Sequence, residues 1–287
     1  MKSILLIRAG LLLVILAMVV PEHLVLGQVE AGEHSVSIND MEMYFEVYGE
    51  GEPVVLLHGF FGSSKMWEPL RDELASAFQL IIPDLRGHGK STNPGKEFTH
   101  RQSAKDVYAL LDHLEIDRFK AMGVSTGGMT LLHMATQQDD RLESMVLIGA
   151  TVYFPDEARA VMEQTTFEKR NDPMWSWLND YHSRGDDQIE MLFNQFHGFK
   201  DSYDDMNFTS PLLSTIETQT LVVHGDRDIF FPVNIPVEMY RAIPNSYLWI
   251  VPNGGHVPIF DEMLPKFLQT ATAFLSNDWG EPFMGEE

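Results

Sequence analysis

The sequence predicts an α/β protein in which helices cover both faces of a mostly parallel sheet. Short apolar runs, typical of buried strands, alternate along the chain with segments whose apolar residues recur at helical spacing. A G-x-S-x-G pentapeptide at residues 123–127 lies between one such strand and one such helix. That position is typical of a strand-to-helix turn that exposes a serine.

The composition limits the class of protein. The 287 residues include 42 Asp and Glu against 20 Lys and Arg, a formal net charge of -22, and 44% of them are hydrophobic. That apolar share suffices for a buried core and excludes an intrinsically disordered chain. The negative charge excludes nucleic acid as a partner, because phosphates are bound by clustered Lys and Arg. With no Cys in the chain, disulfides, thiolate metal sites and a cysteine nucleophile are also excluded.

Residues 1–27 have the pattern of a signal peptide. Lys2 and Arg8 give a positively charged start, residues 9–20 are an unbroken apolar stretch, and Pro21 ends it. We expect cleavage after Gly27, which leaves an exported domain of residues 28–287 with no stable membrane association. The alternative is an N-terminal membrane anchor, although the apolar stretch is shorter than the ~20 residues that span a bilayer.

In the first half of the mature chain, residues 34–38 and 41–48 alternate around a turn, which predicts a β-hairpin. Thr99 and Gln102 form a capping box that opens a helix reaching about Leu114. The other predicted strands here are residues 53–57, 80–82, 119–124 and 145–148, and the other predicted helices are residues 66–74 and 127–137.

The second half resumes the alternation after an interruption. Residues 220–224, 233–242, 247–251 and 263–275 predict strand, helix, strand and helix in turn. The interruption, residues 151–216, is rich in aromatic residues and Met. We interpret it as a helical lid whose aromatics bury one another, with some of them facing an apolar ligand.

Ser125, at the centre of the pentapeptide, is the candidate nucleophile. A sharp turn needs small flanking residues, and the helix that follows favours negative charge developing beside its N-terminus. A serine hydroxyl also needs a base. We assign His256, because its Gly-rich loop follows a predicted strand at the edge where α/β proteins place functional groups. A carboxylate must orient that imidazole; Asp228 is favoured, with Asp226 as the rival.

The negative charge that develops on the substrate oxygen also needs hydrogen-bond donors. The loop at residues 58–62 follows the predicted strand 53–57, so its backbone N–H groups are placed to turn towards Ser125. We expect the N–H groups of Phe60 and Thr126 to form this oxyanion hole. His58 is expected to brace the loop rather than react.

Taken in order, these motifs resemble those of the α/β-hydrolase superfamily, in its lid-bearing serine esterase and lipase-like branch. The resemblance covers about residues 33–277. It implies the order Ser125, Asp228, His256, and it favours Asp228 because this residue matches the acid position in a G-x-x-D-x-x-x-P segment. Ser125 disfavours the dehalogenase-like and epoxide hydrolase-like members, which carry Asp there. The matching segments are residues 58–62, 84–91, 123–127 and 225–232, together with His256.

The resulting hypothesis is a serine carboxylesterase that acts on a small, mainly apolar ester through an acyl-enzyme. No metal or organic cofactor is needed, and the sequence has no H-E-x-x-H or comparable ligand spacing. Two alternatives stay open. One is a C–C bond hydrolase, or another acyl-transfer enzyme, with the same triad. The other is a non-catalytic ligand-binding homologue. The sequence leaves the physiological substrate and the oligomeric state undetermined.

Overall fold

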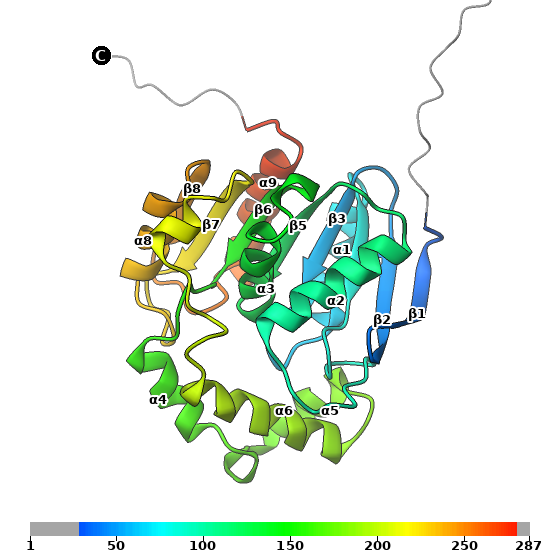
Figure 1. Ribbon diagram of the computed structural model, residues 1–287, viewed down its shortest axis with the longest axis vertical. Coiled ribbons are helices and arrows are strands. Elements are labelled where there is room, and N and C mark those ends of the chain that lie inside the picture. Colours follow the sequence, from blue (N-terminus) through cyan, green and yellow to red (C-terminus); the bar gives the residue numbers. More distant parts are fainter. Residues whose placement is uncertain (1–28, 280–287) are drawn as a thin grey trace, which may run out of the picture.

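The core of the fold is a sheet of eight strands. The computed structural model describes residues 29–279 (Figure 1), so the signal peptide expected at residues 1–27 lies outside the described residues. The strand order is β1-β2-β4-β3-β5-β6-β7-β8; β2 pairs antiparallel with both β1 and β4, and the remaining pairs are parallel. The mostly parallel sheet predicted from the sequence is confirmed. The strands are β1 (Gly32–Ile38), β2 (Met41–Tyr48), β3 (Pro53–Leu57), β4 (Gln79–Pro83), β5 (Phe119–Val124), β6 (Leu142–Ile148), β7 (Gln219–Gly225) and β8 (Ser246–Val251).

Helices cover both faces of this sheet because its central strands are apolar on both sides. In β3, Val55 and Leu57 belong to the core cluster that also contains residues of α2, α3 and α8, whereas Val54 and Leu56 belong to the cluster that contains residues of α1 and α9. Figure 1 shows α2 and α3 in front of the sheet and α9 behind it. These helices are α1 (Glu68–Ala75), α2 (His100–His113), α3 (Thr126–Ala135), α8 (Asn234–Ala242) and α9 (Leu264–Leu275).

The observed element boundaries lie close to those that the sequence predicts. Thr99 caps α2, its hydroxyl oxygen accepting from the Gln102 N–H at 3.0 Å, as the capping box indicates. The helix predicted at residues 66–74 begins as a 3-10 turn, Ser64–Trp67, and becomes α1 at Glu68. Strand β6 begins at Leu142, before the predicted start, because polar residues interrupt the apolar run on which the prediction depended.

The segment between β6 and β7 forms a helical insertion. Its helices are α4 (Asp156–Gln164), α5 (Asp172–Tyr181), α6 (Asp186–Gly198) and α7 (Ser210–Leu213). Figure 1 shows α4, α5 and α6 across the edge of the sheet at which β6 ends. Tyr153 and Asn207 form an antiparallel bridge, so the insertion leaves and rejoins the sheet domain at one neck. The insertion occupies the span for which the sequence predicts a lid, and that role stays a prediction.

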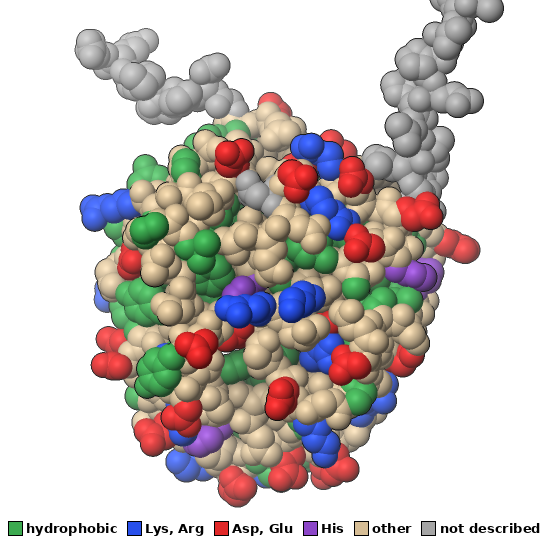
Figure 2. All heavy atoms as spheres, viewed as in Figure 1, with side chains coloured by type: hydrophobic (Ala, Val, Ile, Leu, Met, Phe, Trp, Pro, Cys, Tyr) green, Lys and Arg blue, Asp and Glu red, His purple; other side chains and the backbone are tan. Residues whose placement is uncertain are grey.

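On the face that Figure 2 shows, the acidic side chains do not gather in one patch. Figure 2 shows Asp and Glu side chains scattered among Lys and Arg, with several along the lower rim that the insertion forms. Within residues 29–279, none of the helices is both long enough and apolar enough to cross a bilayer.

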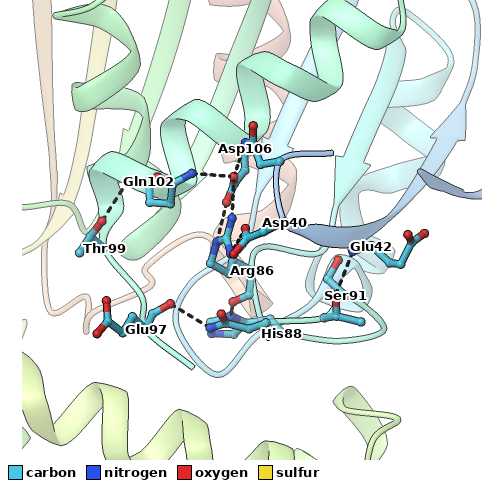
Figure 3. Close-up of polar contacts among 12 residues, drawn as sticks. Asp40, Glu42, Arg86, His88, Ser91, Glu97, Thr99, Gln102 and Asp106 are labelled. Carbon is cyan, nitrogen blue, oxygen red and sulfur yellow. Dashed lines mark hydrogen bonds and ion pairs between the residues drawn. The ribbon is translucent and has the colours of Figure 1, made fainter. Parts of the chain in front are cut away.

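A buried ion pair holds the segment that follows β4. Arg86 donates from Nε and Nη2 to the two carboxylate oxygens of Asp106 in α2, at 2.8 and 2.9 Å. Gln102 also donates to Asp106, and Asp40 in the β1–β2 turn lies 2.7 Å from Arg86 Nη1 (Figure 3). The pair thereby joins α2, the hairpin turn and the segment after β4.

We expect Asp106→Ala to lower the free energy of unfolding by about 3–5 kcal/mol, because it leaves the buried Arg86 guanidinium with only the exposed carboxylate of Asp40. The measurement is urea unfolding followed by tryptophan fluorescence. Asp40→Ala is the control, since its carboxylate is 64% exposed and its pairing with Arg86 is screened by water. Equal losses in the two variants would contradict this account.

Candidate active site

Ser125 lies on a strained turn between β5 and α3. Its backbone has φ 49° and ψ −111°, a conformation that residues with a side chain rarely adopt. Tight packing enforces the turn. A Cβ at Gly123 would lie 2.4 Å from the carbonyl carbon of Gly127, and one at Gly127 would lie 2.2 Å from the Leu57 oxygen. Both flanking residues must therefore be glycine, as the pentapeptide indicates.

The backbone around Ser125 is fully engaged. Its N–H donates to the Ile148 carbonyl at 2.7 Å, and its carbonyl accepts from the Met129 N–H at 2.9 Å, which starts α3. The side chain is half-buried and lines a cavity at the N-terminus of α3. The helix dipole there favours negative charge.

The structure brings Asp228 and His256 together. His256 Nδ1 lies 2.7 Å from Asp228 Oδ2, and Asp228 Oδ1 accepts from the N–H groups of Phe230 and Phe231 at 2.8 and 3.3 Å. Burial raises the pKa of Asp228, but the His256 ring and the Phe230 N–H outweigh it and hold that pKa below its usual range. The ionised carboxylate accepts from Nδ1, which leaves Nε2 as the basic nitrogen of His256.

The rival carboxylate, Asp226, is directed elsewhere. Its backbone N–H donates to the Val251 carbonyl at 3.2 Å, and its side chain lies 3.8 Å from Arg227 Nε. Of the two acids weighed from the sequence, the structure pairs Asp228 with His256.

Sequence reasoning missed His224, at the end of β7. Its Nε2 lies 2.8 Å from the Phe231 carbonyl oxygen, to which it donates, and 3.5 Å from Asp228 Oδ2. Burial lowers the pKa of His224, so the ring is neutral and supports the Asp228 loop through a hydrogen bond. Its position four residues before Asp228, at the end of a buried strand, is the signal that would have found it.

The loop after β3 packs against the Ser125 turn. A Cβ built on Gly59 would lie 3.7 Å from Ser125 Cβ, and both Phe60 and Thr126 line the cavity beside Ser125. Within this loop, His58 donates from Nδ1 to the Gly59 carbonyl and accepts at Nε2 from the Leu85 N–H, at 2.8 and 2.9 Å. Burial lowers the pKa of His58 to about 3. The neutral ring therefore braces the loop, as expected.

His182, at the end of α5, connects the insertion to this loop through hydrogen bonds. Its Nε2 donates to the Phe61 carbonyl and its Nδ1 accepts from the Gly89 N–H, both at 2.9 Å. Gln188 of α6 adds hydrogen bonds to the carbonyls of Gly87 and Gly89. The partners of His182 are backbone atoms 93 and 121 residues away, so no sequence pattern marks this contact.

The cavity that contains Ser125 and His256 has a volume of about 370 Å³ and lies between the sheet edge and the insertion. Within residues 29–279 no Lys, Arg, Asp or Glu lines it, and no group of three or more His, Asp or Glu is placed to hold a metal ion. The insertion contributes Phe154, Met162, Thr165, Met174, Trp177, Phe196 and Phe199 to its walls.

Known proteins are similar to this chain over most of its length. A family model described as alpha/beta hydrolase fold matches residues 52–175. The serine hydrolase BPHL of Homo sapiens is 26% identical over 252 residues, which are 82% of this chain and 85% of that protein. A hydrolase of Pseudomonas putida, 2-hydroxy-6-oxononadienedioate/2-hydroxy-6-oxononatrienedioate hydrolase 2, is 27% identical over 271 residues, covering 80% and 92%. The solved structure of a thermophilic esterase from Thermogutta terrifontis has a TM-score of 0.69 at 25% identity, covering 86% of this chain and 99% of that one.

We expect acid to destabilise the protein in part through His182. Burial lowers the pKa of His182 from 6.5 to about 4, so the unfolded chain binds a proton at pH values where the folded protein does not. The stability that this group contributes above about pH 6.5 is therefore lost as the pH falls towards 4. Urea titrations across this range should show a shallower fall for His182→Gln than for the wild type. The exposed His113→Gln is the control, and identical slopes in all three proteins would refute the assignment.

Proposed function

The chain belongs to the α/β-hydrolase superfamily, and we propose that it is a serine hydrolase that cleaves carboxylic esters of small, mainly apolar substrates. One observation carries the proposal. A strained serine turn and a histidine paired with a buried carboxylate face the same apolar cavity. These are the parts that acyl transfer through a serine requires.

In the first half of the proposed reaction, His256 Nε2 takes the proton from Ser125 Oγ as this oxygen attacks the ester carbonyl. Negative charge then develops on the carbonyl oxygen of the substrate. The N–H groups of Phe60 and Thr126 donate to it, and the N-terminus of α3 adds a favourable dipole. The imidazolium is stabilised by Asp228, whose ionised form faces Nδ1 at 2.7 Å.

In the second half, His256 returns its proton to the leaving alcohol oxygen, which departs and leaves the acyl group on Ser125. A water molecule then gives its proton to His256 Nε2 and attacks the acyl carbonyl. Collapse of this second tetrahedral intermediate breaks the bond to Ser125 Oγ, which takes the proton back from His256, and releases the acid.

The cavity walls support an uncharged substrate. Phe and Met side chains stabilise apolar groups by removing them from water, at about 25 cal/mol per Å². A carboxylate carried into this cavity would lose its hydration, and no cationic side chain of the described chain lines the cavity to replace it.

A C–C bond hydrolase with the same triad is the second candidate, and the Pseudomonas putida relative favours it. The substrate in that relative's name is a dioate, whose carboxylates this cavity does not favour. We therefore favour ester hydrolysis over C–C bond hydrolysis.

We expect Ser125→Ala to reduce hydrolysis of short p-nitrophenyl esters to background, because the nucleophile is removed. Asp228→Asn should lower kcat by about 10³–10⁴-fold through loss of the oriented imidazole, on the scale seen for other serine triads. Asp226→Asn is the matched control and should retain activity. Undiminished turnover by Ser125→Ala, with its fold verified by circular dichroism, would end the proposal.

We also expect purified protein to hydrolyse neutral aryl and alkyl esters faster than vinylogous diketones that carry a terminal carboxylate, because the charged end must be desolvated without a cationic partner. The measurement is kcat/KM for a panel of both classes at one pH. A neutral diketone in the same panel separates the effect of charge from that of the bond cleaved. Faster cleavage of both diketones than of any ester would favour the C–C hydrolase.

A further inference from the structure

A second hollow lies beside the active cavity. It is a surface groove of about 660 Å³ between residues 96–99 and α6. Figure 1 shows α6 below the start of α2. Its outer rim carries exposed charged side chains, whereas its lining also includes Phe98, Met191 and Phe199. The groove therefore combines a solvated rim with an apolar inner wall.

Phe199 is the lining residue that the groove and the active cavity share among the described residues. Phe199 is 6% exposed, and its ring contacts those of Phe60 and Phe154 of the cavity, at centroid distances of 5.1 and 5.7 Å. Phe98 of the groove lies 6.0 Å from the same ring. The two spaces therefore meet at Phe199.

We propose that Phe199 sets the length of acyl chain that the active cavity accepts, by closing a path from the cavity into the groove. This inference rests on the esterase function proposed above. An acyl chain held with its carbonyl at Ser125 gains stabilisation for each methylene that apolar walls remove from water. At Phe199 the apolar space ends, so a longer chain has to bend back or stay in water.

The acyl portion, rather than the alcohol, is the part that extends towards Phe199. The leaving alcohol must lie beside His256, which protonates it, and the His256 ring packs on Phe230 at 4.6 Å. Phe199 instead packs on Phe60, beside the expected oxyanion hole. Phe196 lies between these two sides, 5.5 Å from Phe60 and 6.4 Å from Phe230.

Gly198 offers a means of filling the groove. It precedes Phe199 at the end of α6 with φ −65° and ψ −24°, a helical conformation open to any residue except proline. It lines the groove, and a Cβ built there meets no atom within 4 Å. A tryptophan introduced by Gly198→Trp therefore starts in open space at the groove, and we expect its ring to cover the groove without displacing the cavity walls.

The test is kcat/KM for p-nitrophenyl esters of saturated acids from acetate to palmitate. We expect the wild type to prefer short and medium chains. Phe199→Ala should raise the activity on long chains, relative to its own activity on butyrate, by at least about tenfold, the effect of burying two further methylene groups. Phe196→Ala removes an equal ring from the cavity but not from the wall of the groove, so it should produce no such extension.

The Gly198→Trp/Phe199→Ala double variant should lose the gain on long chains, and Gly198→Trp alone should keep the wild-type profile. An equal gain in Phe196→Ala, or a gain that persists in the double variant, would overturn the proposal. If Phe199→Ala fails to fold by circular dichroism, Phe199→Leu replaces it, because leucine keeps most of the packing and still shortens the wall.

Failure of the proposed function is distinguishable from failure of this inference. If the wild type hydrolyses none of the esters, the esterase function falls. The role of Phe199 is then tested by the binding of n-alkanols of increasing length. Binding is followed by tryptophan fluorescence, since Trp177 lines the cavity. Tighter binding of long alkanols by Phe199→Ala, and not by Phe196→Ala, would support it. Equal binding profiles in the two variants would reject it.

Discussion

The close packing of the Ser125 turn against β3 is the constraint on which the rest of the site depends. Two glycines let α3 start directly above Leu57, and this contact places the serine at φ 49° beside Gly59. A side chain at either glycine would separate β5, β3 and α3. The serine would then be displaced from the loop that carries the expected oxyanion donors, and electrostatic stabilisation by preorganised donors would be lost.

Buried neutral histidines hold the backbone around this turn. His58, His182 and His224 each hydrogen-bond to backbone atoms of the loops that flank the site, and burial lowers the pKa of each. Their neutral rings span gaps between loops without introducing charge into the apolar cavity. His256 differs because its Nδ1 faces the ionised carboxylate of Asp228, an arrangement that the proposed reaction uses.

The protein has a net charge of -22, but no Asp, Glu, Lys or Arg of the described residues lines the cavity. Acidic side chains spread over the visible face (Figure 2), where water and salt screen them beyond ~10 Å, while apolar side chains from the insertion enclose the site. The acidity therefore describes the surface of the protein. Under the proposed function, the choice of substrate depends on the shape of this apolar space, in which single rings such as Phe199 form the boundaries.

Local patterns in the sequence determined the strands, the helices and the motifs at their ends. The pentapeptide, the capping box at Thr99 and the alternation of apolar runs all express interactions between near neighbours, so they are visible without a structure. Tertiary structure decided which groups meet. It brought Asp228, the acid that the sequence favours, to His256, joined His182 to backbone atoms 93 and 121 residues away, and placed Phe199 between the cavity and the groove. Such contacts depend on the direction of each side chain and on backbone partners far along the chain, and neither leaves a periodic trace in the sequence.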